Sequence, residues 1–146
     1  IADTETSIDA VVFNVWINSE GTTTHSVDII QTTQPDTATL TTADFDALTL
    51  NSPATGAART SSTAYAAGGY AQITFNATGR GWISVSGFSK IGTREGTYDV
   101  DNASPPDGQT YTNTAFSETA GTTNDPYFDI TSTVPVVRDQ DYAIFV

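Results

Sequence analysis

The chain has 146 residues, which is enough for one domain with a sizeable core, and Thr (27), Val (10) and Ile (10) greatly outnumber Leu (3), as in β-proteins. Acidic residues outnumber basic ones by 17 to 5, so the net charge of -12 disfavours nucleic acid and anionic membranes as partners. No run approaches the roughly 20 apolar residues of a spanning helix, and membrane insertion is not expected. The absence of Cys excludes thiolate catalysis, disulfides and cysteine-based zinc sites.

The first part of the chain predicts two strands. Residues 8–17 alternate with a period of 2, and their apolar residues share one face that we expect to be buried. Turn residues at 19–21 separate them from a second alternating stretch, residues 25–32, so we expect a hairpin. His25, the only histidine, follows a run of threonines, and we interpret it as a solvated turn residue without a catalytic role.

The middle of the chain contains the clearest strand pattern. Residues 41–50 are expected to be irregular, and the Gly- and Pro-containing residues 51–69 to form a long loop or a flat edge. The strand follows at residues 70–77, and a weaker strand is expected within residues 88–94. The inward positions of the clear strand are predicted to be Ala71, Ile73, Phe75 and Ala77.

The last third predicts short strands separated by turns. Residues 99–108 are a loop by their Asp, Asn, Pro and Gly content, and residues 109–118 and 127–131 read as strands. A final strand is expected at the C-terminus. The whole pattern predicts an all-β fold, an antiparallel jelly-roll β-sandwich, with residues 1–146 as a single domain and residues 132–146 as a C-terminal extension.

Several turn and strand motifs stand out in the middle and late chain. They are Asn76-Ala77-Thr78-Gly79, Trp82-Ile83, Gly87, Lys90-Ile91-Gly92 with Arg94-Glu95, Asp101-Asn102 before Pro105, Phe116-Ser117-Glu118, Gly121-Thr122 and Asp125-Pro126-Tyr127-Phe128-Asp129-Ile130-Thr131. In these motifs, over roughly residues 8–131, the chain resembles the disaggregatase-related, DNRLRE-type surface modules. The resemblance implies a carbohydrate-binding-like jelly roll of a secreted microbial or phage surface protein, and it specifies the fold better than any ligand.

The chain departs from this family at its ends. Such modules carry a strand before the one that residues 8–17 predict, whereas the tail after residue 131 looks like that strand moved to the C-terminus. The tail could complete its own sheet or insert into a neighbouring subunit by strand addition, and both arrangements stay open. The predicted assembly strand consists of Tyr142, Ala143, Ile144, Phe145 and Val146, and we expect it to pair beside residues 11–17.

Acidic residues of the loop at 99–108 suggest one cofactor hypothesis. Asp99, Asp101 and Asp107 offer the hard oxygen ligands that Ca²⁺ takes, although the spacing does not match an EF-hand. The alternative is a solvated acidic loop without metal. No other cofactor is expected.

Aromatic and amide side chains suggest glycan contacts. Flat rings with a polar edge can stack on sugars, and Tyr70 with Gln72 on the outward face of a strand is the favoured pair. Tyr98 and Tyr111 flank the acidic loop as further candidates, and Asn76 and Asn102 each begin an N-glycosylation acceptor pattern. The broader set of rings considered for such a platform also includes Trp16, Tyr65 and Trp82.

No pattern nominates a catalytic group, so we expect a protein that is not an enzyme. The composition and the apolar terminal strand favour a structural subunit of an extracellular filament or virion surface, a homo-oligomer or polymer assembled by strand pairing. The alternative is a glycan-binding adhesion module.

Overall fold

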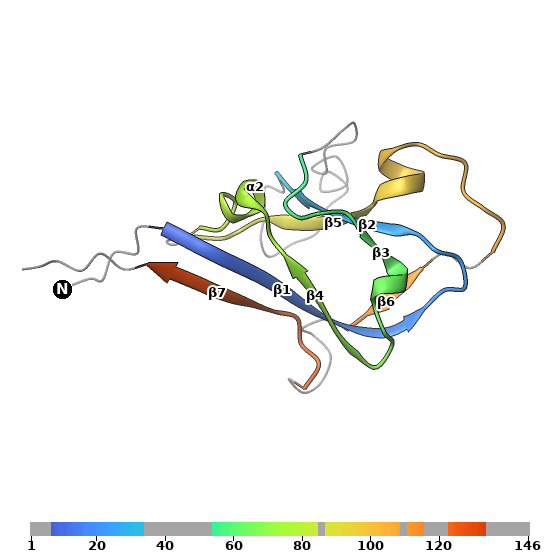
Figure 1. Ribbon diagram of the computed structural model, residues 1–146, viewed down its shortest axis with the longest axis horizontal. Helices are drawn as coiled ribbons and strands as arrows, with labels where there is room; N and C mark the ends of the chain where they lie inside the picture. The colour runs from blue at the N-terminus through green and yellow to red at the C-terminus, as the bar shows by residue number, and fades with distance from the viewer. Residues whose placement is uncertain (1–6, 34–53, 85–86, 109–110, 116–122, 134–146) are drawn as a thin grey trace, which may run out of the picture.

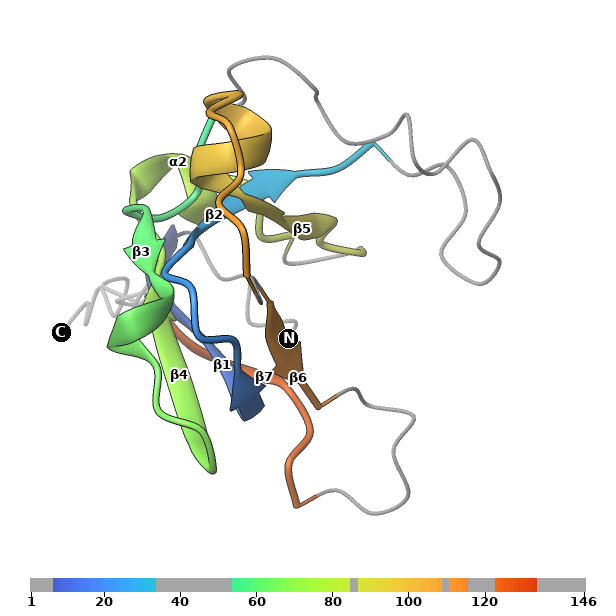
Figure 2. The same cartoon turned by 90° about the vertical axis from the view of Figure 1, so that its right-hand side faces the viewer.

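Two antiparallel sheets dominate the computed structural model, which describes residues 7–33, 54–84, 87–108, 111–115 and 123–133 (Figures 1 and 2). In the first sheet the long strand β1 (Ser7–Glu20) pairs on one edge with β4 (Gly69–Thr74). On its other edge, the first part of β1 pairs with β7 (Tyr127–Thr133) and the last part pairs with β6 (Thr112–Thr114). In the second sheet β2 (Ser26–Gln31) lies between β3 (Thr60–Ser61) and β5 (Ile91–Glu95). The all-β prediction is therefore confirmed.

The two sheets pack face to face around one apolar cluster. Val11, Ile73 and Phe75 contribute from the first sheet and Ile29 from the second, and Ala57 completes the cluster. Alternation in β1 and β4 explains this, because every second side chain of a strand points to the same face. The inward positions predicted at residues 71, 73 and 75 are confirmed as buried.

The expected hairpin between the first two strands is wrong. β1 and β2 belong to different sheets, and the residues between them carry the chain from one layer to the other. Gly21 N–H donates to Tyr111 O in this connection, at 2.9 Å. His25 is also not a solvated turn residue, because it is 6% exposed and its Nε2 lies 2.7 Å from Thr112 Oγ1 of β6.

One side of the double layer is closed by residues 54–57. Thr55 forms a bridge to Ile30 of the second sheet, and Ala57 forms one to Phe75 at the end of β4. Between these bridges, Gly56 lies so close to Gly79 that a Cβ on Gly79 would come within 2.2 Å of Gly56 O. The sequence predicted a loop or flat edge at residues 51–69. The described part of this segment is mostly loop, but it also contains β3 and the two bridges.

Three short helical segments cap strand ends. They are η1 (Ser62–Ala64), α2 (Ala77–Arg80) and η2 (Gly96–Val100), which is a π-helical turn. Asn76 caps α2 by accepting from Gly79 N–H at 3.0 Å. Because the chain turns into α2 at this point, Ala77 is exposed, and its predicted inward position is wrong.

Some sequence predictions lie outside the described residues. These include the irregular segment 41–50 and the terminal strand 142–146.

β7 extends to Thr133, two residues beyond the predicted strand. Within the described ranges, no helix is long and apolar enough to cross a membrane.

Candidate functional site

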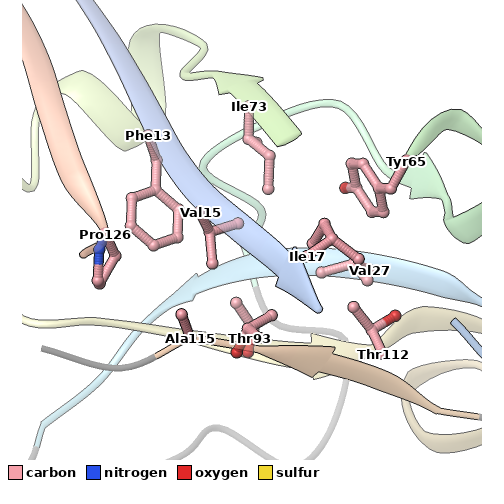
Figure 3. Close-up of a pocket in the computed structure, with 11 residues that line it drawn as sticks. Phe13, Val15, Ile17, Val27, Tyr65, Ile73, Thr93, Thr112, Ala115 and Pro126 are labelled. Atoms are coloured by element: carbon pink, nitrogen blue, oxygen red, sulfur yellow. The ribbon is translucent and has the colours of Figure 1, made fainter. Parts of the chain in front are cut away.

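A cavity of about 370 Å³ lies between the two sheets, and its walls are mostly apolar (Figure 3). It is lined by Phe13, Val15, Ile17, Val27, Tyr65, Ile73, Thr93, Thr112, Thr114, Ala115 and Pro126. For comparison, an engineered apolar cavity of about 150 Å³ is large enough to hold benzene. Protein interiors are normally packed without such voids. The core is therefore incomplete beside the second half of β1.

Two strand positions that point toward the interior are exposed. Ile130 of β7 lies opposite Val11, so the two side chains share the inner face, yet Val11 is 0% and Ile130 48% exposed. Thr93 of β5 lies opposite the buried Ile29 and is also exposed. Among the described strands, β5 pairs only with β2, and none of the second sheet lies beyond it. Within the described residues, no strand lies beside β5 to cover Thr93 and Ile130.

The cavity and the ends of the described chain are far apart along β1. Ser7 pairs with Thr133, so β1 begins and β7 ends at the same end of the molecule (Figure 1). The cavity begins at Phe13, six residues further along β1, which corresponds to about 20 Å of extended strand. The cavity therefore lies toward the end of the molecule opposite to Ser7 and Thr133.

The predicted position of the assembly strand, beside residues 11–17, is wrong. β4 pairs with β1 from Val12 to Ile17 on one edge, and on the other edge β7 pairs up to Asn14 and β6 from Ile17 onward. Ala115 N–H also donates to Trp16 O at 3.0 Å. Alternation identified β1 as a strand but could not show that both of its edges are occupied.

The residues proposed for calcium have basic partners instead. Asp99 accepts from Arg94 at 2.6 and 2.8 Å, and Asp101 forms an ion pair with Arg59. Arg59 also binds the fully buried Asp28, with Nη2 2.8 Å from Oδ2. Asp107 is exposed, and no group of three His, Asp or Glu side chains suited to a metal ion occurs in the described parts of the chain. The geometry gives the calcium hypothesis no support.

These ion pairs surround a strongly capped turn. Glu95 accepts hydrogen bonds from four backbone N–H groups, those of Ser26, Thr97, Tyr98 and Asp99. Burial alone would raise the pKa of Glu95, but the four donors together hold it below its ordinary value of 4.5. The hydrogen bonds from Arg94 likewise lower the pKa of Asp99. The cluster is thus a fixed, ionised network that holds η2 on the outer face of the second sheet.

Tyr70 and Gln72 share the outer face of β4 as predicted, but both have protein partners. Tyr70 packs edge-on against Trp16 and Tyr127, with ring centroids 5.2 and 5.3 Å away, and its hydroxyl donates to Thr123 O and Asp125 O. Gln72 Nε2 donates to Asn14 Oδ1 at 3.1 Å. Rings at 76° and 81° to one another do not form a flat sugar platform.

The other two tyrosines lie apart from this face. Tyr98 lines a cleft of about 540 Å³ on the second sheet, together with Thr24, His25, Ser26, Arg59, Ser61 and Thr97. Its hydroxyl donates to Thr24 O at 3.2 Å. Tyr111 precedes β6 and is 42% exposed. The structure therefore does not bring the four glycan candidates together.

Sequence reasoning missed a partly buried polar row beside the cavity. Thr112 Oγ1 donates to Glu20 Oε2 at 3.0 Å and also lies beside His25 Nε2. The second oxygen of Glu20 and the hydroxyl oxygen of Tyr65 are both buried, and the Glu20 oxygen has no hydrogen-bond partner among the described residues. No local motif signals this row, because its members come from β1, β6 and the connections between sheets.

The two N-glycosylation acceptor patterns occupy different surroundings. Asn76 Nδ2, the atom that would carry a glycan, donates to Thr55 O at 2.9 Å while Oδ1 caps α2. Asn102 is exposed and has a positive φ of 53°. Of the two, Asn102 is the accessible acceptor.

The comparisons with known proteins add no relative. No protein family, no curated protein and no solved structure matches the chain. The resemblance to the DNRLRE-type modules therefore stays a prediction from the sequence motifs.

Proposed function

We propose that the protein is a non-enzymatic structural subunit of an extracellular filament or virion surface, and that its subunits join by pairing of β-strands. We also propose that its sheets follow a jelly-roll connectivity. The observation that carries the assembly proposal is the apolar cavity between the two sheets, which the described residues do not fill.

Insertion of a tail into a neighbour's cavity can build a polymer. A tail and a receiving cavity are two different surfaces, so the contacts form an open filament when each tail enters the next subunit, and a closed pair when two subunits exchange tails. The polymer is the arrangement that we propose. Strand pairing also satisfies every backbone donor and acceptor along the joint, which suits a chain that has no Cys for disulfide links.

Electron microscopy and light scattering test this proposal. The full chain should form regular filaments or arrays, and a chain that lacks residues 142–146 should remain a monomer of lower stability. A matched control carries the same deletion followed by five Gly/Ser residues, which keeps the length and removes the apolar strand. A full chain that stays monomeric at all concentrations, or deletion variants that still assemble, would contradict the proposal.

A glycan-binding module is the second candidate function, and the cleft beside Tyr98 favours it. Five residues with hydroxyl groups line the cleft, and the Arg59 charge is balanced there by two carboxylates, which favours a neutral sugar over an acidic one. Tyr98→Ala should reduce retention on a binding polysaccharide, whereas Tyr111→Ala should not. Equal retention of both variants and the parent chain would remove this cleft from consideration.

A further inference from the structure

We infer that the Arg59–Asp101 ion pair is the polar edge of the cleft beside Tyr98, and that it selects a neutral sugar with two adjacent hydroxyl groups over an acidic sugar. The inference rests on the second candidate function, the glycan-binding cleft. It adds the class of the ligand and names Asp101 as the residue that determines it.

Arg59 is held in one orientation at the wall of the cleft. Its Nε and Nη2 donate to the fully buried Asp28, at 3.0 and 2.8 Å. Gly96 leaves room for the guanidinium group, because a Cβ on Gly96 would come within 2.5 Å of Arg59 Nε. The Arg59 side chain is nevertheless 36% exposed. The guanidinium group is therefore fixed by buried contacts while part of it stays accessible to a ligand.

Asp101 occupies the other edge of this guanidinium group. Nη1 forms an ion pair with Asp101 Oδ2, and Nη2 donates to Asp101 Oδ1 at 3.1 Å. Two such parallel bonds are the bidentate geometry in which arginine binds carboxylates. The hydrogen bonds from Arg59 also lower the pKa of Asp101, so its carboxylate is ionised at neutral pH. An acidic ligand would have to displace a carboxylate that already belongs to the chain.

The same ion pair offers donors and acceptors to hydroxyl groups. Asp101 is 52% exposed, and its carboxylate oxygens can accept more bonds than the two from Arg59. Nη1 has two N–H groups, and among the described residues it donates only to Asp101. One hydroxyl of a sugar can thus donate to Asp101 while the adjacent hydroxyl accepts from Arg59.

Tyr98 provides the apolar side of the same cleft. Its ring belongs to η2, and its hydroxyl is tied to Thr24 O at 3.2 Å, which fixes the ring beside the ion pair. Flat rings offer apolar area to the face of a sugar. A ring surface with a charge-balanced polar edge is suited to a neutral sugar.

Matched pairs of sugars test the selection. The probes are the methyl glycosides of glucose and galactose and those of the corresponding uronic acids, which differ from them by a carboxylate. Saturation-transfer NMR detects the ligand, so it works on monomers and filaments alike. The parent chain should bind at least one neutral glycoside about tenfold or more tightly than its acidic counterpart, because Asp101 repels a second carboxylate. Tyr98→Ala should abolish this binding.

Asp101→Asn should remove the preference. The variant frees one edge of Arg59 for a carboxylate, so its affinity for the uronic acid glycoside should rise about tenfold or more. Asp107→Asn is the control, because it removes the same charge from an exposed position in the same loop and should leave the preference unchanged.

The outcomes separate this inference from the glycan-binding function. If the parent binds a neutral glycoside in the cleft and Asp101→Asn keeps the same preference, the role of Asp101 is overturned and the glycan-binding function stands. Equal affinities of the parent for neutral and acidic glycosides would have the same meaning. If neither the parent nor Asp101→Asn binds any of the four probes, or if binding survives in Tyr98→Ala, both the inference and the function of the cleft are overturned.

Discussion

Ile130 lies directly opposite Val11 in the ladder between β7 and β1, yet Val11 is fully buried and Ile130 is 48% exposed. Residues that face each other across a strand pair share one side of the sheet, so their burial normally matches. The mismatch arises because the second sheet extends over β1 but, within the described residues, not over β7.

The first prediction concerns the buried carboxylate of Asp28. Asp28→Asn should lower the free energy of unfolding by about 2 kcal/mol, because hydrogen bonds to a charged group typically contribute about 1.5–3 kcal/mol and Arg59 loses its buried partner. Asp101→Asn is the control, since it removes the half-exposed partner of the same arginine and should have a much smaller effect. Urea unfolding at pH 7 measures both, and equal effects would contradict the account.

The second prediction is a pH dependence that comes from Glu95. Its folded pKa is lower than its ordinary value of 4.5, so its stabilising contribution is complete above about pH 4.5 and is lost as the pH falls further. Glu95→Gln should therefore cost about 1 kcal/mol at pH 7, as loss of a helix cap does, and nothing at the acid end. Thermal unfolding from pH 3 to pH 7 tests this. A constant difference between variant and parent across that range would rule out ionisation as the cause.

The third prediction concerns the contact between Gly56 and Gly79. Gly79→Ala should destabilise the fold by about 1–3 kcal/mol, because the new Cβ would lie 2.2 Å from Gly56 O and the two backbones must separate. Gly81→Ala is the matched control two residues later, where the closest atom is 3.3 Å away, and it should change stability by less than about 0.5 kcal/mol. Chemical unfolding of both variants gives the comparison.

The fourth prediction concerns Tyr70. Tyr70→Ala should lower the melting temperature, because it removes the ring that packs between Trp16 and Tyr127. Tyr70→Phe keeps this ring and loses only the hydroxyl, so its melting temperature should stay closer to that of the parent. The sequence alone favoured a free ligand-binding ring, for which Tyr70→Ala would leave the melting temperature unchanged. Calorimetry of the two variants distinguishes these cases.

The strands and their inward faces could be predicted from sequence because alternation is a local property. The faces of β1 and β4 follow directly from residues such as Val11, Ile73 and Phe75. Strand partners are not local, which is why β1 was expected to pair with β2 rather than with β4, β6 and β7. Local alternation contains no information about which edges meet.

The candidate sites show the same limit. Asp101 reads as a free calcium ligand because its partner Arg59 lies 42 residues earlier in the chain. His25 read as solvated because Thr112, which lies beside it, is 87 residues away. The cavity could not be foreseen from any segment, since its walls come from both sheets. The sequence did predict an apolar C-terminal strand, residues 142–146, that requires a strand to pair with.

A reconstruction of the assembled protein by electron cryo-microscopy tests the central claim most directly. The account predicts that neighbouring subunits are joined by a β-strand whose side chains fit residues 142–146 and whose density continues into a different subunit from the one that it pairs with. A terminal strand that pairs within its own subunit, or a regular filament without strand pairing between subunits, would contradict it.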